Sequence, residues 1–562
     1  MDPWTVDRGP WTVDCGLRTR DHGLAIVLGM LVRLLGSVAL LAISIACRGE
    51  VRESPPRPST PEFELNELSV AQLQDGMTSG RYTSRRLVEL YLQRIAQIDG
   101  AGPTLRSVIE TNPDALAIAD ALDAERKAKG PRGPLHGIPI LIKDNIDTGD
   151  KMLTTAGSLA LTGGPAPRDA FVVERLRAAG VVILGKTNLS EWANIRSAKS
   201  TSGWSARGGQ VKNPYVLDRN PCGSSSGTGA AIAASLATVG VGTETDGSVV
   251  CPSAVSALVG IKPTIGLVSR TGIIPIAHSQ DTAGPMARTV ADAAALLNGM
   301  VGVDPRDAAM AAAPAAREDY TAALKADALK RARIGVPRAQ YFGYNAPADA
   351  AVDAAIAVMK AQGATIVDPA DIPTAARLDA CEIEVLLYEF KSDLNSYLAT
   401  RGSAAAASTL KDLIAFNERE RAREMPYFGQ ELFIRAESKG PLTSPEYRAA
   451  ATQCRRLARD EGIDAVMTMH KLDALVVPTL GPAWPTDLVN GDHITGGGST
   501  PAAVAGYPSI TVPAGWAGEL PVGVLFMGRG WSESRLISLA FAYEQASRQR
   551  KPPKFLPTIP LN

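Results

Sequence analysis

The sequence of 562 residues lacks several features that mark whole classes of protein. It has no charge excess, since 58 basic residues balance 58 acidic ones, whereas a nucleic-acid binder would show a basic surplus. Its six cysteines are too widely spaced for a C-x-x-C motif, and its five histidines show no H-E-x-x-H spacing. We therefore expect no nucleic-acid partner, no metal site and no cofactor.

Aromatic residues are also scarce, at 5%, whereas 45% of the residues are hydrophobic, a proportion typical of an ordinary globular protein. The length alone would allow two to four domains. No tract after residue 63 suggests a second independent unit, however. We expect a single catalytic domain over residues 63–556.

The N-terminal region does not look like part of that domain. Residues 1–23 are polar and repeat the sequence PWTVD, and residues 24–47 are almost entirely apolar, with Arg33 as their single charge. Since ~20 apolar residues span a bilayer, an uncleaved membrane anchor is one interpretation. An ordinary cleaved secretory signal is another.

A start at Met30 gives the interpretation that we favour. The chain then begins with a short basic segment and an apolar segment, and Cys47 lies at the end behind the small Ala46. This arrangement resembles a bacterial lipoprotein signal, in which the cysteine is lipidated. All three interpretations predict export to the periplasm or envelope. In two of them the protein stays attached to the membrane, through a lipidated Cys47 or through the anchor. Residues 48–62 are Pro-rich and predict an extended tether.

The body of the chain alternates helical and strand patterns. Ser69 and Thr83 or Ser84 begin two amphipathic helices, and Asn112-Pro113 predicts a third helix with the proline at its first position. The segment at 172–193 indicates a helix, a strand that lacks alternation, a loop and another helix.

The C-terminal part continues this alternation. GYPSITVPAG (506–515) and PVGVLFMG (521–528) predict paired strands, and a closing helix follows from Glu533 to Arg548. An α/β architecture with a large mixed sheet between helix layers accounts for these elements.

The serine-rich stretch at 220–264 carries the chemistry. It has very low charge and many glycines and alanines, which is unlike a surface linker and typical of a buried segment with close backbone approaches. Ser224, Ser225, Ser226 and Ser248 are then hydroxyls held inside the protein.

Two familiar motifs fit this stretch poorly. Gly223-x-Ser225-x-Gly227 would be the nucleophile elbow of an α/β-hydrolase, but loop-like residues precede it where a strand is needed, and neither His470 nor His493 is well placed as the base. A phosphate-binding loop is disfavoured as well, because there is no G-K-[ST] sequence.

A third interpretation rests on resemblance. The stretch GSSSGTGAAIAASLATVGVGTETDGSVVCPSAVSALVGIKPTIGLVS resembles the signature of the amidase signature family of serine hydrolases. GIPILIKDNID, LGKTNLSEWA and the C-terminal PAAVAGYPSITVPAG…PVGVLFMG are similar to other segments of that family, in the same order. The resemblance covers residues 63 to about 550 and implies the family's large mixed, mostly parallel twisted sheet between helix layers.

The resemblance implies a Ser–cis-Ser–Lys triad. Carried over by motif, Ser248 is the nucleophile, Ser224 is the bridging serine after a cis peptide bond, and Lys143 is the base. Taken alone, a lysine at the end of a buried strand reads as a surface residue that extends its amine to water. The resemblance reverses that interpretation for Lys143.

The implied chemistry is acylation of Ser248, release of ammonia or an amine, and attack by water. Lys143 has to be neutral to accept a proton, so its pKa has to fall from ~10.4 to near neutrality, which costs about 4 kcal/mol of solvation. Ser224 would relay the proton. Backbone N–H groups of Thr245, Asp246, Gly247 and Ser248 would form the oxyanion hole, each worth about 3 kcal/mol.

Other residues around the motif have supporting roles. We expect Ser225 to support the triad by hydrogen bonding, Asp281 to brace the serine loop and His278 to be a hydrogen-bonded loop residue. Cys222 and Cys251 flank the site, where proximity would permit a disulfide in an oxidising compartment.

Sequence details favour one substrate class. No cation follows Ser248 to bind a substrate carboxylate, since Val249-Val250-Cys251 comes next, so a small dicarboxylic half-amide is disfavoured as substrate. TETDGS, CGSSSG and IAHSQDTAGPMARTV together resemble peptide amidases, which remove the C-terminal amide of peptides.

Three alternatives to a peptide amidase remain. They are a broad aliphatic or aryl amidase, an inactive envelope lipoprotein that only binds peptides, and one component of a glutamyl-tRNA amidotransferase. Export disfavours the last, because that role is cytosolic, and the filled triad positions disfavour the inactive lipoprotein. The expected partner is a small peptide or amide substrate.

Overall fold

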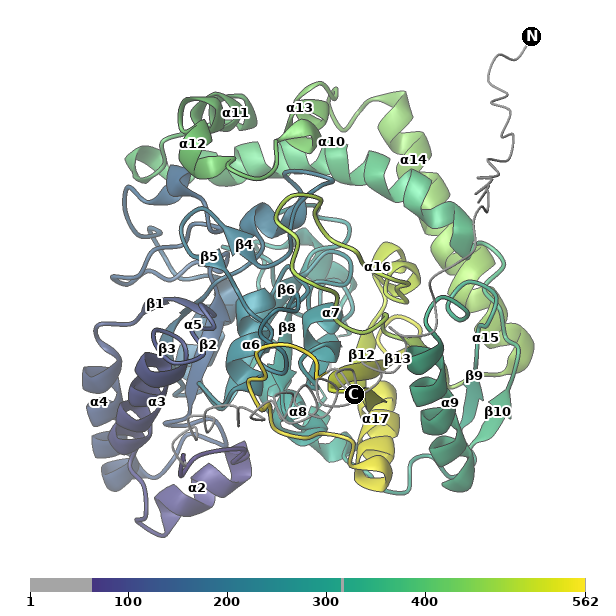
Figure 1. Ribbon diagram of the computed structural model, residues 1–562, viewed down its shortest axis with the longest axis horizontal. Coiled ribbons are helices and arrows are strands. Elements are labelled where there is room, and N and C mark those ends of the chain that lie inside the picture. Colours follow the sequence, from purple (N-terminus) through teal and green to yellow (C-terminus); the bar gives the residue numbers. More distant parts are fainter. Residues whose placement is uncertain (1–62, 315–317, 561–562) are drawn as a thin grey trace, which may run out of the picture. The chain divides into compact units, whose positions relative to one another are not determined.

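An eleven-stranded sheet forms the centre of the computed structural model, which describes residues 63–314 and 318–560 (Figure 1). In sheet order the strands are β1 (Val108–Thr111), β3 (Val182–Thr187), β2 (Pro139–Lys143), β6 (Val239–Glu244), β8 (Thr282–Ala287), β7 (Val259–Lys262), β12 (Ser509–Ala517), β13 (Leu520–Met527), β11 (Ala474–Pro478), β9 (Arg333–Gly335) and β10 (Thr365–Val367). Residues from Phe63 onward form one compact unit. The predicted anchor or signal, Cys47 and the tether lie outside the described residues.

The sheet is mixed, as predicted. Parallel pairing joins β3, β2 and β6 on one flank and β11, β9 and β10 on the other. The strands between them pair antiparallel, including the predicted hairpin of β12 and β13. Among the antiparallel neighbours, β12 and β13 form the hairpin, and β7 leads to β8 through a loop that contains no helix.

The helices pack around this sheet. They are α2 (Val70–Thr78), α3 (Ser84–Ile98), α4 (Ala115–Lys129), α5 (Phe171–Ala178), α6 (Ser226–Ala233), α7 (Val250–Ala254), α8 (Val290–Met300), α9 (Ala346–Ala361), α10 (Leu378–Ala399), α11 (Leu410–Arg419), α12 (Arg421–Glu424), α13 (Glu431–Glu437), α14 (Pro445–Arg455), α15 (Asp464–His470), α16 (Thr500–Ala505) and α17 (Glu533–Ser547). Figure 1 shows α10 along one edge with α11, α13 and α14 beside it. Every residue of β2, β3 and β6 is buried, so helices and loops cover both faces of the sheet there.

Two of the three predicted N-terminal helices begin where the sequence indicates. The Ser69 side chain accepts from the backbone N–H of Gln72 in a capping box at the start of α2, and the Thr83 side chain caps α3. The predicted start of the third helix at Pro113 is wrong. The Asn112 Oδ1 accepts from the Asp114 N–H at 2.9 Å, so these residues form a turn and α4 begins only at Ala115.

The predicted helix after β3 is also wrong. Glu191–Asn194 is a short irregular turn in which Trp192 and Ala193 have φ of 51° and 53°, in the left-handed region. Tertiary contacts outweigh helix propensity here: the Trp192 N–H donates to the Ala156 carbonyl at 3.0 Å, and its buried indole packs on Phe433. The turn brings Ser190 against the serine-rich stretch, where its N–H donates to the Ser224 carbonyl at 3.1 Å.

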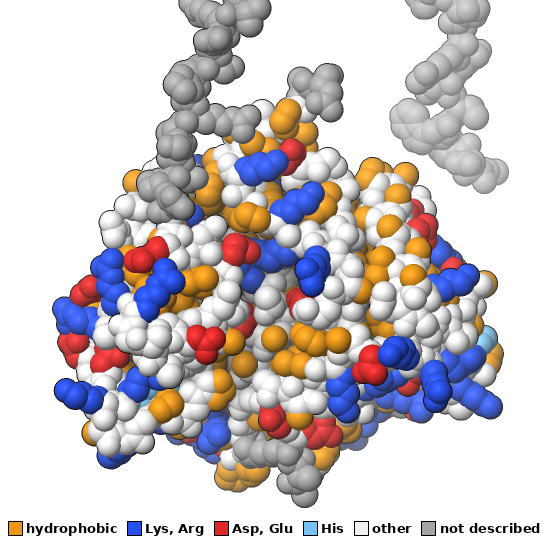
Figure 2. Space-filling view, turned by 90° about the horizontal axis from the view of Figure 1, so that it is seen from below, with side chains coloured by type: hydrophobic (Ala, Val, Ile, Leu, Met, Phe, Trp, Pro, Cys, Tyr) orange, Lys and Arg blue, Asp and Glu red, His pale blue; other side chains and the backbone are white. Residues whose placement is uncertain are grey.

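Among the described residues, no helix is both long enough and apolar enough to cross a membrane. Basic and acidic side chains are interspersed on the face drawn in Figure 2, as the balanced composition predicts.

Candidate active site

Lys143 ends β2 with its side chain fully buried, and its amine faces oxygen atoms only. The Nζ lies 2.8 Å from Ser224 Oγ, 2.9 Å from Thr243 Oγ1 and 3.2 Å from the Thr243 carbonyl oxygen. A neutral amine has two N–H groups and one lone pair. The two Thr243 oxygens can accept the two N–H groups, which leaves the lone pair to accept the Ser224 hydroxyl proton.

Burial favours this neutral form. It lowers the pKa of Lys143 to about 7, and the more distant Asp281 and Glu244 carboxylates oppose the shift only in part. No carboxylate oxygen hydrogen-bonds to the amine among the described residues. The group can therefore lose its proton near neutral pH.

The serine-rich stretch turns sharply at the lysine. The peptide bond between Gly223 and Ser224 is cis, as the resemblance implies. Ser225 follows, and its Oγ donates to the Thr243 carbonyl at 3.1 Å while accepting from the Thr243 N–H at 3.2 Å. Its backbone N–H donates to the Ser248 carbonyl at 3.1 Å. Ser225 thus ties β6 to the loop that carries Ser248.

Two glycines make this close approach feasible. A Cβ on Gly223 would collide with the Ser190 hydroxyl, and a Cβ on Gly242 in β6 would lie 2.7 Å from Ser225 Oγ. At these two positions the stretch contains glycine because there is no room for a side chain, as the sequence predicts.

The loop between β6 and α7 carries Ser248, which is 8% exposed. Gly247 has φ of 75°, a value that favours glycine. The Glu244 Oε2 accepts from the backbone N–H groups of Val249 at 2.7 Å and Val250 at 2.9 Å. The four preceding N–H groups, of residues 245–248, donate to no other group in the part of the chain that the structure describes. They remain available to an oxyanion.

Asp281 links this loop to its neighbour. Its Oδ1 accepts from Thr245 Oγ1 at 2.6 Å, and its Oδ2 accepts from the backbone N–H groups of Ile276 and Ala277 at 2.8 and 2.9 Å. Burial raises the pKa of Asp281 to about 6. The carboxylate holds two loops together, which is the role that the sequence predicts for it.

Two cavities reach the triad. One, of about 360 Å³, is lined by Ser248, Gly223 and the 245–247 loop. The other, of about 370 Å³, is lined by Ser224, Thr243 and Asp281. Thr245 and Ile276 line both. The predicted nucleophile and the predicted proton relay therefore each lie beside a cavity large enough for a small amide, although Ser224 itself is fully buried.

Two disulfides are present among the described residues. Cys222–Cys251 joins the residue before Gly223 to a residue shortly after Ser248, with Cα atoms 6.0 Å apart. The sequence indicates that these two cysteines flank the site, where they could come close enough to bond. Cys381–Cys454 joins α10 to α14 and carries no signal in the sequence, since the two residues are 73 positions apart.

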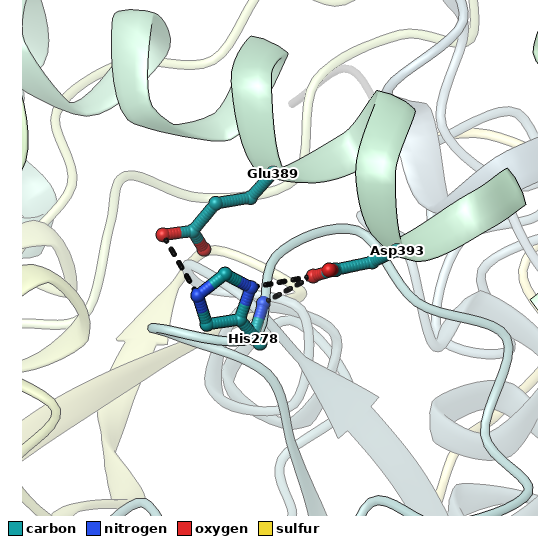
Figure 3. Close-up of side chains that lie close together, drawn as sticks. All are labelled: His278, Glu389 and Asp393. Atoms are coloured by element: carbon teal, nitrogen blue, oxygen red, sulfur yellow. Dashed lines mark hydrogen bonds and ion pairs between the residues drawn. The ribbon is translucent and has the colours of Figure 1, made fainter. Parts of the chain in front are cut away.

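His278 lies between two carboxylates of α10 (Figure 3). Its Nδ1 is 2.8 Å from Asp393 Oδ2, and its Nε2 is 3.5 Å from Glu389 Oε1. Each of the three side chains offers one atom that can bind a metal ion, and these atoms lie within 4.8 Å of one another, as the ligands of one ion would. The hydrogen bond with Asp393 raises the pKa of His278, and a protonated imidazole can donate to both carboxylates. We interpret the cluster as an ion pair between the 276–281 loop and α10.

Sequence reasoning missed Thr243 and Asn145. Thr243 provides two of the three oxygens around Lys143, and Asn145 Nδ2 donates to Thr243 Oγ1 at 2.9 Å. Asn145 stands two residues after Lys143, and Thr243 stands five residues before Ser248. Their proximity to the triad along the chain was the available signal.

Comparison with known proteins is consistent with this geometry. The model of the Amidase family matches residues 86–537. A probable amidase of Arabidopsis thaliana is 42% identical over 526 residues, covering 92% of this chain and 96% of the relative. A glutamyl-tRNA(Gln) amidotransferase component from Acinetobacter baumannii is 36% identical over 499 residues, covering 86% of this chain and 96% of that protein.

Among solved structures, the native peptide amidase of Stenotrophomonas maltophilia superposes with a TM-score of 0.84. It is 51% identical in sequence, and the match covers 88% of this chain and all of that chain.

Proposed function

The chain belongs to the amidase family, and we propose that it is a peptide amidase that removes the C-terminal amide of peptides and releases ammonia. The observation that carries the catalytic part is the Lys143 amine, buried without a hydrogen-bonded carboxylate and 2.8 Å from Ser224 Oγ. The similarity to a peptide amidase over 88% of this chain supports the substrate class.

In the proposed acylation, Ser248 Oγ attacks the carbonyl carbon of the terminal amide. Its proton passes to Ser224, whose own proton passes to the Lys143 lone pair. The oxyanion that forms accepts hydrogen bonds from the free N–H groups of residues 245–248. The C–N bond then breaks as the leaving nitrogen takes a proton back through Ser224, and ammonia departs.

Deacylation reverses these roles. A water molecule attacks the Ser248 ester and gives its proton to Lys143 through Ser224. The ester bond breaks, Ser248 Oγ regains a proton and the peptide acid leaves. The neutral lysine is restored, so each cycle begins with the same protonation state.

We also propose export to the periplasm or envelope, with attachment through Cys47 or an N-terminal anchor. The two disulfides support it, because such bonds form and persist in oxidising compartments. Mass spectrometry of the mature N-terminus distinguishes the forms of attachment: a lipid on Cys47 supports the lipoprotein, and an unmodified, uncleaved Met1 contradicts the lipoprotein.

Ammonia release from an amidated dipeptide tests the main proposal. We expect release by the wild type, none above background by Ser248→Ala, and full release by Ser253→Ala. Ser253 is the matched control, because it lies in the adjacent α7 and its buried hydroxyl has no hydrogen-bond partner among the described residues. Equal activity of wild type and Ser248→Ala would overturn the assignment.

A panel of simple aliphatic and aryl amides tests the alternative substrate class. A kcat/KM higher for these amides than for amidated dipeptides would favour a broad amidase over a peptide amidase.

A further inference from the structure

We propose that Asp246 and Glu382 form a cation-binding subsite beside Ser248, which selects amide substrates with a positively charged group near the scissile bond. This inference rests on the proposed function and specifies which peptide amides the site prefers.

The two carboxylates come from separate elements and line the same cavity of about 360 Å³ as Ser248. Asp246 lies in the loop two residues before the nucleophile, and its Oδ2 accepts from Thr500 Oγ1 at 2.7 Å. Glu382 lies on α10 and is 9% exposed, and its Oε1 accepts from Gln280 Nε2 at 2.7 Å.

Each carboxylate keeps an oxygen for a ligand. Asp246 Oδ1 is buried and makes no hydrogen bond of normal geometry among the described residues, although the nearby Ser499 hydroxyl lowers the pKa of this carboxyl in part. The Oε2 of Glu382 has no hydrogen bond to any described residue either. A buried carboxylate oxygen without a partner is costly, so a donor that enters the cavity gains the interaction that the protein leaves open.

The wall of the cavity carries no compensating charge, although Lys262, which lies outside the wall, lowers the pKa of Asp246 in part. None of the described residues that line it is a lysine, arginine or histidine. Burial raises the pKa of both carboxyls, and Asp246 raises that of Glu382 further because like charges lie close together. A cation between them would relieve both the repulsion and the lack of a partner. An anion would add to the repulsion.

The rest of the wall suits the stem of such a cation. Leu386, Leu480 and Ile494 line the same cavity. A short alkyl chain that ends in an ammonium or guanidinium could lie along these side chains with its charged end toward the carboxylates. Two sources provide this chemistry: the basic side chain of an amidated C-terminal residue, or the free α-ammonium of a very short substrate.

Matched substrates separate the two sources. In the first arm, kcat/KM is compared for acetyl-alanyl-lysinamide and acetyl-alanyl-norleucinamide, which differ by the charged group alone. In the second arm, alanyl-leucinamide is compared with its N-acetyl form. A preference for the cationic member of at least about ten-fold in either arm supports the subsite and identifies the source. Equal rates in both arms overturn it.

Isosteric variants connect the preference to these residues. We expect Glu382→Gln and Asp246→Asn each to reduce the ratio of kcat/KM between cationic and neutral substrates to near one. Glu384→Gln is the matched control, since this neighbour on α10 instead pairs with Lys439 at 2.6 Å, and it should keep the wild-type ratio. A preference that persists in both site variants overturns the assignment.

A binding measurement covers variants that fail to fold. Calorimetry with Ser248→Ala is carried out on both substrate pairs. The Kd of the cationic member should be at least about ten-fold below that of the neutral member in the pair that shows the kinetic preference, and equal values in both pairs contradict the proposal. The outcomes also separate this inference from the proposed function. If neutral and cationic peptides are hydrolysed equally, only the subsite fails. If no amidated peptide releases ammonia, the peptide amidase assignment fails.

Discussion

Lys143 and Lys186 lie on adjacent parallel strands, β2 and β3, and both are fully buried. Their surroundings differ. The Lys186 Nζ donates to the Ile146 carbonyl at 2.6 Å and to Thr154 Oγ1 at 2.8 Å, away from any serine of the 220–264 stretch. The Lys143 Nζ faces Ser224 and Thr243 instead.

The difference shows that burial alone does not make a lysine a base. Burial lowers the pKa of both amines, but four carboxylates oppose the shift at Lys186, with the largest effects from Asp144 and Asp147, against two carboxylates at Lys143. Lys186 compensates buried negative charge, so we assign it a structural role. Neither amine hydrogen-bonds to a carboxylate among the described residues, but only Lys143 contacts a serine hydroxyl that can deliver a proton.

Replacement of each lysine by methionine should show the largest difference between the two positions. We expect Lys143→Met to reduce kcat/KM by about 10²–10⁴-fold, because it removes the general base, with little change in the thermal midpoint. Lys186→Met should instead destabilise the protein by about 1–3 kcal/mol, because it leaves the buried Ile146 carbonyl and Thr154 hydroxyl without their donor. Steady-state kinetics and denaturant unfolding measure the two effects. The reverse pattern would assign the base to Lys186.

The pH dependence of kcat/KM should also distinguish Lys143 from Lys186. The base has to be neutral, and burial lowers the pKa of Lys143 to about 7, so activity should be low at pH 5–6 and rise to a plateau above about pH 8. The Lys186→Met variant should show the same rise of kcat/KM with pH as the wild type. A wild-type profile that is flat between pH 6 and 8 would contradict a neutral lysine.

The two disulfides offer a comparison of a site element with a remote one. Cys222–Cys251 and Cys381–Cys454 close loops of 29 and 73 residues, so removing either should cost about 4 kcal/mol of stability. Only the first flanks Ser224 and Ser248. We expect the Cys222→Ser/Cys251→Ser variant to lose about ten-fold or more in kcat below its unfolding temperature, and Cys381→Ser/Cys454→Ser to keep its kcat. Equal losses would show that the first bond does not position the serines.

The smallest effect is expected at His278, where a titratable group pairs with carboxylates near the surface. Its pKa is raised in the folded protein, chiefly by the hydrogen bond with Asp393. The stabilisation should be fully present below the unfolded pKa of about 6.5 and be lost as pH rises through the folded value. The difference in thermal midpoint between wild type and His278→Gln should therefore shrink from pH 6 to pH 9. A difference that grows with pH would contradict the ion pair.

The sequence predicts the elements that local signals specify. Ser69 and Thr83 begin their helices as expected, and the apolar run before Lys143 forms a buried strand. The irregular turn at Trp192 could not be predicted, because it depends on Ala156 and Phe433, which lie far away in the chain.

The site shows the same division. The motifs of the family indicate Ser224, Ser248 and Lys143, whereas the local pattern alone does not separate Lys143 from Lys186, because both lie near the ends of buried strands. The difference depends on which oxygens the fold brings to each amine. The role of Glu382 is likewise invisible in the sequence, since α10 brings it to the cavity from more than a hundred residues away.

Labelling with phenylmethanesulfonyl fluoride tests the central claim most directly, because the reagent sulfonylates an activated serine as fluoride leaves. Peptide mapping by mass spectrometry locates the label, and its rate is followed from pH 5 to 9 in wild type, Lys143→Met and Lys186→Met. We predict a label on Ser248, a rate that rises with a midpoint near pH 7, and loss of labelling in Lys143→Met alone. A label on Ser225, or equally rapid labelling in Lys143→Met, would contradict the account.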